Sequence, residues 1–213
     1  MNTYRIGVIA DTHVPEFSPG LPSQIEHHFQ GVDMILHAGD ITGLGVLEKL
    51  SSIAPVISVK GDHDTLDLPM KTTIDVGGKR IGLIHGRRSR WKELPSIIAN
   101  ALSGGRRFWW GGFQRQVVQL FDDVDAVVFG HFHRAYIAMY NNVLFFNPGA
   151  VYQLTPAKAQ KELRTTRSLL RRIYLFRHAY LYNRKHDVPM LPTVGLLTIA
   201  NGEIKAEVLP ISE

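Results

Sequence analysis

The chain has 213 residues, 45% of them hydrophobic, and so is long enough to bury a core in one domain, or in one domain with insertions. The absence of cysteine excludes disulfides and thiolate metal sites, while ten histidines leave imidazole, carboxylate and amide oxygen as candidate metal ligands. No stretch approaches the roughly 20 apolar residues of a membrane span, and the N-terminal residues do not resemble a secretory signal, so we expect a cytoplasmic protein.

The net charge of +5 conceals two basic segments. Residues 157–185 contain nine Lys or Arg residues against one acidic residue, and residues 87–107 contain six against one. These segments carry +8 and +5, which leaves −8 for the remainder of a chain whose total is +5. The sequence therefore predicts an acidic body with two basic segments, and the high pI describes those segments rather than the whole surface.

Apolar runs of strand length begin near the N-terminus and alternate with helix-like stretches. Residues 4–10, 34–38 and 55–59 have the composition of buried strands, and residues 22–29 and 44–50 lie between them with helical spacing. This β-α-β-α-β order predicts a sheet with parallel strands and covering helices.

The later strands are expected to pair through tight turns. Gly77-Gly78, Asn141-Asn142 and Asn201-Gly202 are typical hairpin turns. The apolar runs near them cover residues 81–84, 126–129, 137–140, 143–146 and 194–199. We therefore predict an α/β fold in which two mixed sheets pack face to face with helices outside.

Two segments are longer than the connections that such a fold needs. Residues at about 87–121 contain a helical stretch at 93–102 followed by an aromatic and basic run. Residues at about 155–190 read as one long helix over 157–185, with apolar residues on one side and arginines on another. We expect both segments to be insertions into a single domain that spans residues 1–213.

Polar residues follow five of the apolar runs, at the point where each run ends. Their order along the chain is Asp11-Thr12-His13, Gly39-Asp40, Gly61-Asp62-His63-Asp64, His85-Gly86 and Gly130-His131-Phe132-His133. Loops at the carboxyl ends of parallel strands converge on one crevice, so these side chains are expected to lie close together.

Seven of these residues offer a carboxylate or an imidazole: Asp11, His13, Asp40, Asp62, His85, His131 and His133. Seven ligands exceed the four to six that one ion takes and suit two ions that share a bridging group. Two divalent ions about 3.5–4 Å apart can clamp and polarise a phosphate. A single Gly-Asp is more often a helix cap, but five such clusters in this order favour a metal site.

The ordered set, together with Asn147-Pro148-Gly149-Ala150, resembles the calcineurin-like metallophosphoesterases, and most closely their compact single-domain phosphodiesterase branch. The resemblance covers residues 4–86, 125–154 and the last hairpin, while the two basic segments fall outside it. It implies a four-layer αββα sandwich with a dimetal site at one end of the sheets.

The resemblance also implies a role for each site residue. One ion would be held by Asp11, His13 and His133, the other by His85 and His131, and Asp40 would bridge them. Asp62 stands where the family usually has an asparagine ligand to the second ion. His63 matches the histidine that protonates the leaving oxygen, and Asp64 matches the acidic residue that would orient its imidazole.

The implied activity is hydrolysis of a phosphodiester or phosphomonoester through a metal-bound hydroxide. Two divalent ions are expected, with manganese first and iron, nickel or zinc as alternatives. A nucleotide or a lipid-linked phosphoester would suit as the small-molecule substrate. The contrasting hypothesis is a non-catalytic scaffold of the same fold, similar to a retromer subunit that serves protein contacts. The retained His63 and the full ligand set favour an enzyme.

Three hypotheses concern the basic segments. They could form a cap over the crevice, where Trp91, Phe108, Trp109 and Trp110 could stack on substrate. Residues 157–185 could instead contact an anionic membrane surface or nucleic acid. In the third, the apolar side of this helix covers the core or a second copy of the chain, and its arginines are solvated.

Overall fold

The computed structural model describes residues 2–103, 111–181 and 191–211, and the chain divides into two compact units. The first, the sheet unit, comprises Met1–Arg87, Gln114–Tyr152 and Leu191–Glu213. The second, called the helical unit, comprises Arg88–Phe113 and Gln153–Met190. The candidate site residues all belong to the sheet unit.

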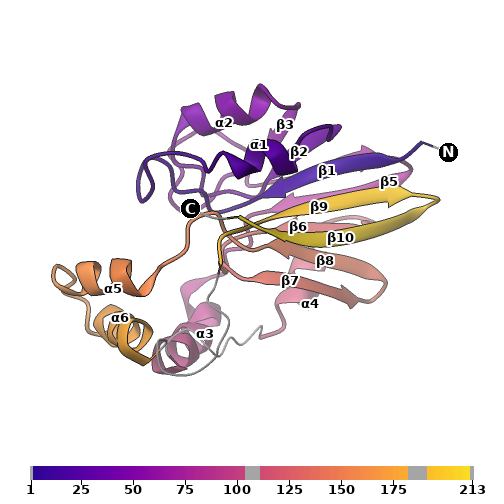
Figure 1. The fold of residues 1–213 in the computed structure, drawn as a ribbon. Helices are drawn as coiled ribbons and strands as arrows, with labels where there is room; N and C mark the ends of the chain where they lie inside the picture. Colours follow the sequence, from indigo (N-terminus) through magenta and orange to yellow (C-terminus); the bar gives the residue numbers. More distant parts are fainter. Residues whose placement is uncertain (1, 104–110, 182–190, 212–213) are drawn as a thin grey trace. The chain divides into compact units, whose positions relative to one another are not determined.

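One sheet of the sheet unit combines the N-terminal and C-terminal parts of the chain (Figure 1). Its strands, in spatial order, are β10 (Glu203–Pro210), β9 (Thr193–Ala200), β1 (Tyr4–Ile9), β2 (Met34–His37) and β3 (Val56–Ser58). The last three run parallel and are linked by α1 (Gln24–His28) and α2 (Leu44–Ser51), whereas β9 and β10 form an antiparallel hairpin beside β1.

The second sheet has three parallel strands flanked by hairpin partners. Its strands, in spatial order, are β4 (Lys71–Val76), β5 (Lys79–Ile84), β6 (Ala126–Phe129), β8 (Val143–Pro148) and β7 (Ala135–Tyr140). Strands β5, β6 and β8 run parallel, while β4 pairs antiparallel with β5 and β7 with β8. All three predicted hairpin turns are thereby confirmed.

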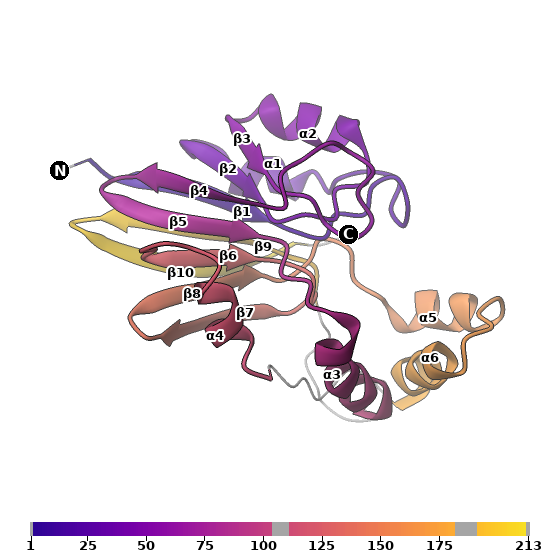
Figure 2. The same ribbon diagram turned by 180° about the vertical axis from the view of Figure 1, so that it is seen from behind.

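Apolar side chains of the two sheets meet in a shared core. The first sheet contributes Ile6, Val8 and Leu36, and the second contributes Ile81, Leu83, Val128 and Phe146, all of them buried. On the other side of the first sheet, Phe29 and Leu50 fill the layer under α1 and α2. Helix α4 (Phe113–Val118) lies against the second sheet (Figure 2). Gln114 at the start of α4 donates to the Tyr136 hydroxyl of β7 at 2.6 Å. This is the predicted sandwich of two mixed sheets flanked by helices.

The helical unit contains α3 (Arg90–Ser103), α5 (Pro156–Leu163) and α6 (Leu169–Leu181). The prediction of one long helix over 157–185 is therefore wrong. The low helix propensity of Thr165 and Thr166 ends α5, and the Ser168 hydroxyl caps the next helix by accepting from the Arg171 amide at 3.5 Å. The Arg171 guanidinium also donates from Nε and Nη2 to the two carboxylate oxygens of Glu162, at 2.8 and 3.0 Å. The buried side chains of Ala159, Leu175 and Ala179 pack α5 against α6.

The roles proposed from sequence for the basic segments stay predictions. Phe108, Trp109 and Trp110, and residues 182–185 of the expected long helix, lie outside the described residues. Within the described ranges, no helix has the length and apolar character needed to cross a membrane.

Candidate metal centre

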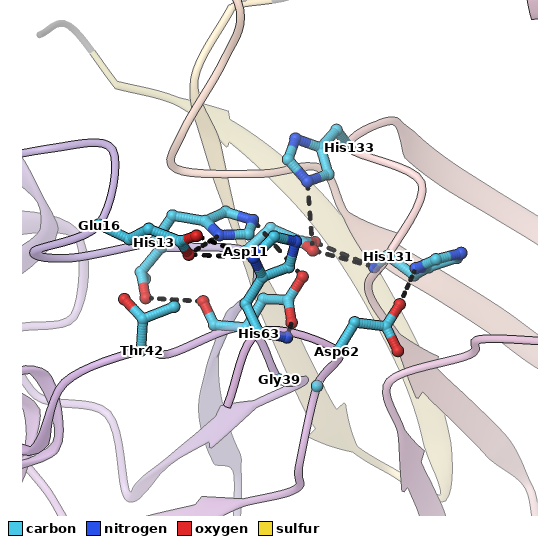
Figure 3. Close-up of polar contacts among 12 residues, drawn as sticks. Asp11, His13, Glu16, Gly39, Thr42, Asp62, His63, His131 and His133 are labelled. Carbon is cyan, nitrogen blue, oxygen red and sulfur yellow. Dashed lines mark hydrogen bonds and ion pairs between the residues drawn. The ribbon is translucent and has the colours of Figure 1, made fainter. Parts of the chain in front are cut away.

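Five loops of the sheet unit meet at the carboxyl ends of β1, β2, β3, β5 and β6, as the sequence predicted. Figure 3 shows labelled residues of the loops after β1, β2, β3 and β6. The Asp11 amide donates to the Gly39 carbonyl at 3.0 Å within the first sheet. His85 at the end of β5 donates from Nδ1 to the Ala38 carbonyl at 2.7 Å, which ties the second sheet to the first. One backbone bond and one bond from a site side chain thus fix the loops to one another.

Five of the seven candidate ligands have left-handed backbones. The φ angles are 51° for Asp11, 48° for His13, 56° for Asp40, 70° for His131 and 52° for His133. A residue with a Cβ in this region carries strain on the order of 1 kcal/mol, and such strain concentrates at functional sites. The chain therefore turns sharply after β1, β2 and β6, where these five candidate ligands lie.

Two glycines let the Asp40 loop lie close to its neighbours. A Cβ on Gly39, whose φ is +90°, would stand 2.7 Å from Nδ1 of His85. A Cβ on Gly61 would collide with the amide nitrogen and Oδ1 of Asp40. The glycines of the two Gly-Asp motifs are therefore required by close approach of the backbone, not only by turn conformation.

The first group of candidate ligands consists of Asp11, His13 and His133, whose donor atoms all lie within 4.8 Å of one another. Nε2 of His133 stands 3.4 Å from Oδ1 of Asp11. The fully buried Asp11 carboxylate also accepts from the His131 amide at 3.1 and 3.2 Å, which fixes its orientation.

The second group consists of Asp62, His85 and His131, again with donor atoms within 4.8 Å of one another. Oδ2 of Asp62 lies 3.2 Å from Nδ1 of His131 and 4.0 Å from Nε2 of His85. The structure therefore brings Asp62 to the place of a ligand in this group.

Asp40 lies between the two groups. Its Oδ2 is 3.5 Å from Nε2 of His13 and 3.4 Å from Nε2 of His85, while its Oδ1 accepts from the His63 amide at 2.9 Å. Burial alone would raise the pKa of this carboxyl, but the facing imidazoles of His85 and His13 and the hydrogen bond from the His63 amide together hold the pKa well below its usual range. One carboxylate thus faces both groups, as a bridging ligand would.

The tautomer of His85 shows whether the candidate ligands are suited to metal ions. Nδ1 carries the proton, because a carbonyl oxygen can only accept, so in the neutral ring Nε2 presents a lone pair. That Nε2 is buried without a hydrogen bond and faces Oδ2 of Asp40 at 3.4 Å. A lone pair facing a carboxylate is repulsive unless a proton or a cation lies between them. The donors therefore fit divalent cations.

His63 lies at the rim of the site, with 42% of its side chain exposed. Its Nδ1 stands 3.1 Å from Oε1 and 3.0 Å from Oε2 of Glu16, and its ring is 4.8 Å from that of His13. The Glu16 carboxylate favours the tautomer with the proton on Nδ1 and leaves Nε2 for proton exchange with a bound molecule.

The structure corrects the carboxylate predicted to orient His63. Oδ1 of Asp64 accepts from the amides of Ile41 and Thr42 at 2.8 and 2.7 Å, and its Oδ2 accepts from the Gly61 amide at 2.8 Å. These bonds turn the Asp64 carboxylate toward the backbone of the Asp40 loop. Asp64 therefore holds that loop, and Glu16 holds the imidazole of His63.

Sequence reasoning missed two residues of the site. Glu16 lies three positions after His13 in the same loop, and that spacing was the one signal for it. Arg87 was counted among the residues of a basic insertion, yet its Nη1 donates to Oδ1 of Asp62 at 2.9 Å. Its position directly after the His85-Gly86 pair was the available signal.

His37, the last residue of β2, is a buried and hydrogen-bonded strand residue. It is 0% exposed, its Nδ1 accepts from the Gly39 amide at 3.2 Å, and its Nε2 lies 3.3 Å from the Thr12 hydroxyl. Burial lowers the pKa of the imidazole from 6.5 to about 4. The neutral ring therefore holds the loop that carries Asp40, through the hydrogen bond from the Gly39 amide.

This lowered pKa makes folding stability depend on pH. Between pH 6.5 and about 4 the unfolded chain binds a proton at His37 that the folded chain does not, so stability falls as pH falls through this window. The full loss is roughly 3 kcal/mol. Urea unfolding of the chelator-treated protein at several pH values measures it. His37→Gln should flatten the slope, whereas the exposed His27→Gln should not; equal slopes in both variants would contradict the assignment.

Comparison with known proteins agrees with this geometry. Residues 4–166 match the calcineurin-like phosphoesterase superfamily domain. A probable metallophosphoesterase of Methanocaldococcus jannaschii is 32% identical over 150 residues, which are 70% of this chain and 68% of that protein. Another from Methanothermobacter thermautotrophicus is 29% identical over 148 residues, 68% of this chain and 76% of that protein.

Among solved structures, vacuolar protein sorting 29 from Cryptosporidium parvum matches with a TM-score of 0.62 and 20% identity over 99% of both chains. At that identity the likeness shows the fold alone. The family match, by contrast, covers most of the chain and includes all five polar loops. The chain therefore belongs to the calcineurin-like phosphoesterase superfamily.

Proposed function

We propose that the chain is a phosphoesterase that uses two divalent metal ions to hydrolyse a phosphomonoester or phosphodiester. The observation that carries this proposal is the pair of ligand groups that share Asp40, with the imidazole of His63 beside them. Manganese is our first choice of metal, and iron, nickel and zinc accept the same oxygen and imidazole donors.

Each ligand group would hold one ion. Asp11, His13 and His133 form one group, Asp62, His85 and His131 form the other, and Asp40 belongs to both. When bound, the ions supply Lewis-acid activation of the phosphoester and of water. The protein contributes rigidity, because carbonyls and amides of neighbouring loops already orient the Asp11 and His85 side chains.

His63 would act as the general acid. In its charged form the ring carries a proton on Nε2, which passes to the leaving oxygen as the bond between phosphorus and that oxygen breaks. Glu16, at 3.0 Å from Nδ1, keeps the ring oriented before and after the transfer. The exposed rim position suits a leaving group that departs into solvent.

Metal reconstitution tests the proposal. The protein is stripped with chelator and reloaded with Mn²⁺, Fe²⁺, Ni²⁺ or Zn²⁺ singly, and hydrolysis of p-nitrophenyl phosphate is compared with that of the bis-ester. We expect turnover to return with at least one metal, two ions bound per chain, and manganese to be most effective. Two bound ions without hydrolysis of either ester would overturn the enzyme proposal.

The second candidate is a protein-binding scaffold of the same fold. Strand β7 is the edge of the second sheet and exposes Ile137 and Met139 on one face. An exposed edge strand with apolar side chains suits contact with a partner protein. Reconstitution separates the candidates, because a scaffold would bind metal without turning over either ester.

A further inference from the structure

Asp62 divides its two carboxylate oxygens between different partners. Oδ2 faces the second ligand group, at 3.2 Å from Nδ1 of His131 and 4.0 Å from Nε2 of His85. Oδ1 accepts from Nη1 of Arg87 at 2.9 Å. Asp62 therefore stands between the candidate metal ligands and a guanidinium.

A carboxylate can do this and an asparagine cannot. An asparagine could face an ion with its carbonyl oxygen, but its amide nitrogen would then point at Arg87, and two donors would oppose each other. With aspartate, both oxygens accept, and the charge of Arg87 offsets the additional negative charge beside the ligand group. The Asp62 side chain thus serves as an anchor for Arg87 at the edge of the site.

Arg87 retains donors for a further partner. Its side chain is 56% exposed, and the hydrogen bond to Asp62 uses one of the five N–H groups of a guanidinium. The planar arrangement of these donors matches the oxygens of a phosphate. Arg87 also follows His85 by two positions, so the strand end that supplies a candidate ligand carries the guanidinium as well.

We propose that Arg87 binds a non-bridging oxygen of the phosphoester and that Asp62 positions it for this contact. The inference rests on the proposed function, because it assigns phosphate recognition at the same site. It also gives a physical reason for the aspartate at position 62: this residue is both ligand and anchor.

Binding of inorganic phosphate to the Mn²⁺-loaded protein, measured by calorimetry, tests the contact without turnover. Arg87→Ala should weaken phosphate binding about 10-fold, because a charge-assisted hydrogen bond is lost. Arg87→Lys should recover part of the loss, since it keeps the charge but not the fork. Arg80→Ala, which removes an arginine from an exposed pair with Asp75 at 2.8 Å, should change nothing.

A double-mutant cycle tests the anchor. Asp62→Asn should weaken phosphate binding by about as much as Arg87→Ala, and the double variant should be no weaker than either single variant, because both remove the same contact. A parallel Mn²⁺ titration confirms that each variant is loaded. Additive losses, or equal behaviour of Arg87→Ala and Arg80→Ala, would overturn the proposal.

The same measurements separate this inference from the proposed function. If phosphate binding depends on Arg87 but the protein hydrolyses neither p-nitrophenyl ester, the result would support the contact between Arg87 and phosphate and contradict the proposed phosphoesterase activity. If the protein turns over an ester, and Arg87→Ala changes neither KM nor phosphate affinity, the result would support the phosphoesterase proposal and contradict the contact between Arg87 and phosphate.

Discussion

Replacing His63 with asparagine is expected to lower kcat by about 10²–10⁴-fold, the range that positioned proton transfer contributes, while Mn²⁺ binding stays close to that of the wild type. The imidazole belongs to neither of the two groups that share Asp40, although it lies within 4.8 Å of donor atoms of His13 and Glu16, so its loss removes the proton donor and none of the seven candidate ligands. Its backbone amide still donates to Oδ1 of Asp40 at 2.9 Å, so the variant retains the loop.

The leaving group distinguishes proton donation from a structural role. p-Nitrophenolate departs without much help, whereas phenolate or an alkoxide needs the proton. His63→Asn should therefore lose more activity on phenyl phosphate than on p-nitrophenyl phosphate. Equal losses on both esters, with unchanged metal binding, would show that His63 is not the acid.

Two carboxylate variants test which residue orients the ring. Glu16→Gln keeps a polar group near Nδ1 of His63 but removes the charge at 3.0 Å, and should lower kcat about 10-fold on phenyl phosphate with the melting temperature preserved. Asp64→Asn should chiefly lower the melting temperature, because it disturbs the acceptors of three backbone amides. If Asp64→Asn lowered kcat with the melting temperature preserved, while Glu16→Gln left kcat unchanged, Asp64 would be the residue that orients His63.

The sequence predicted those parts of the site that depend on strand ends. Asp11, Asp40 and His85 each follow a buried parallel strand. Because the carboxyl ends of parallel strands lie together in any α/β sheet, the order of these residues along the chain was sufficient to predict that they meet. Glu16 and His63 are 47 positions apart, and their pairing depends on how closely the loops after β1 and β3 approach each other. No periodicity or spacing in the chain encodes that contact.

Charge patterns were a poor guide to individual contacts. Arg87 belongs by sequence to a basic run, and only the geometry shows its pairing with Asp62. Similarly, the apolar spacing from Leu163 to Leu170 continues through the turn between α5 and α6, so periodicity alone predicted one helix. The ion pair of Glu162 with Arg171 and the Ser168 cap favour two helices, and neither is visible as a break in the hydrophobic pattern.

Replacing Asp40 with asparagine is expected to weaken Mn²⁺ binding at both positions by about 100-fold or more, since even residues that only orient ligands commonly contribute 10- to 100-fold. Oδ2 of Asp40 lies within 3.5 Å of imidazole nitrogens from both groups. An amide nitrogen at that place would direct N–H groups toward the cations, and the remaining oxygen could serve the His63 amide but not both ions.

Calorimetric titration of chelator-stripped protein with Mn²⁺ measures the effect, and Asp75→Asn is the matched control. Asp75 lies in an exposed pair with Arg80 on the β4–β5 hairpin, so its substitution makes the same change in net charge away from the site. The control should bind two ions as the wild type does. If Asp40→Asn instead kept one ion at wild-type affinity, Asp40 would belong to a single ligand group, and the shared carboxylate on which the two-ion proposal depends would be contradicted.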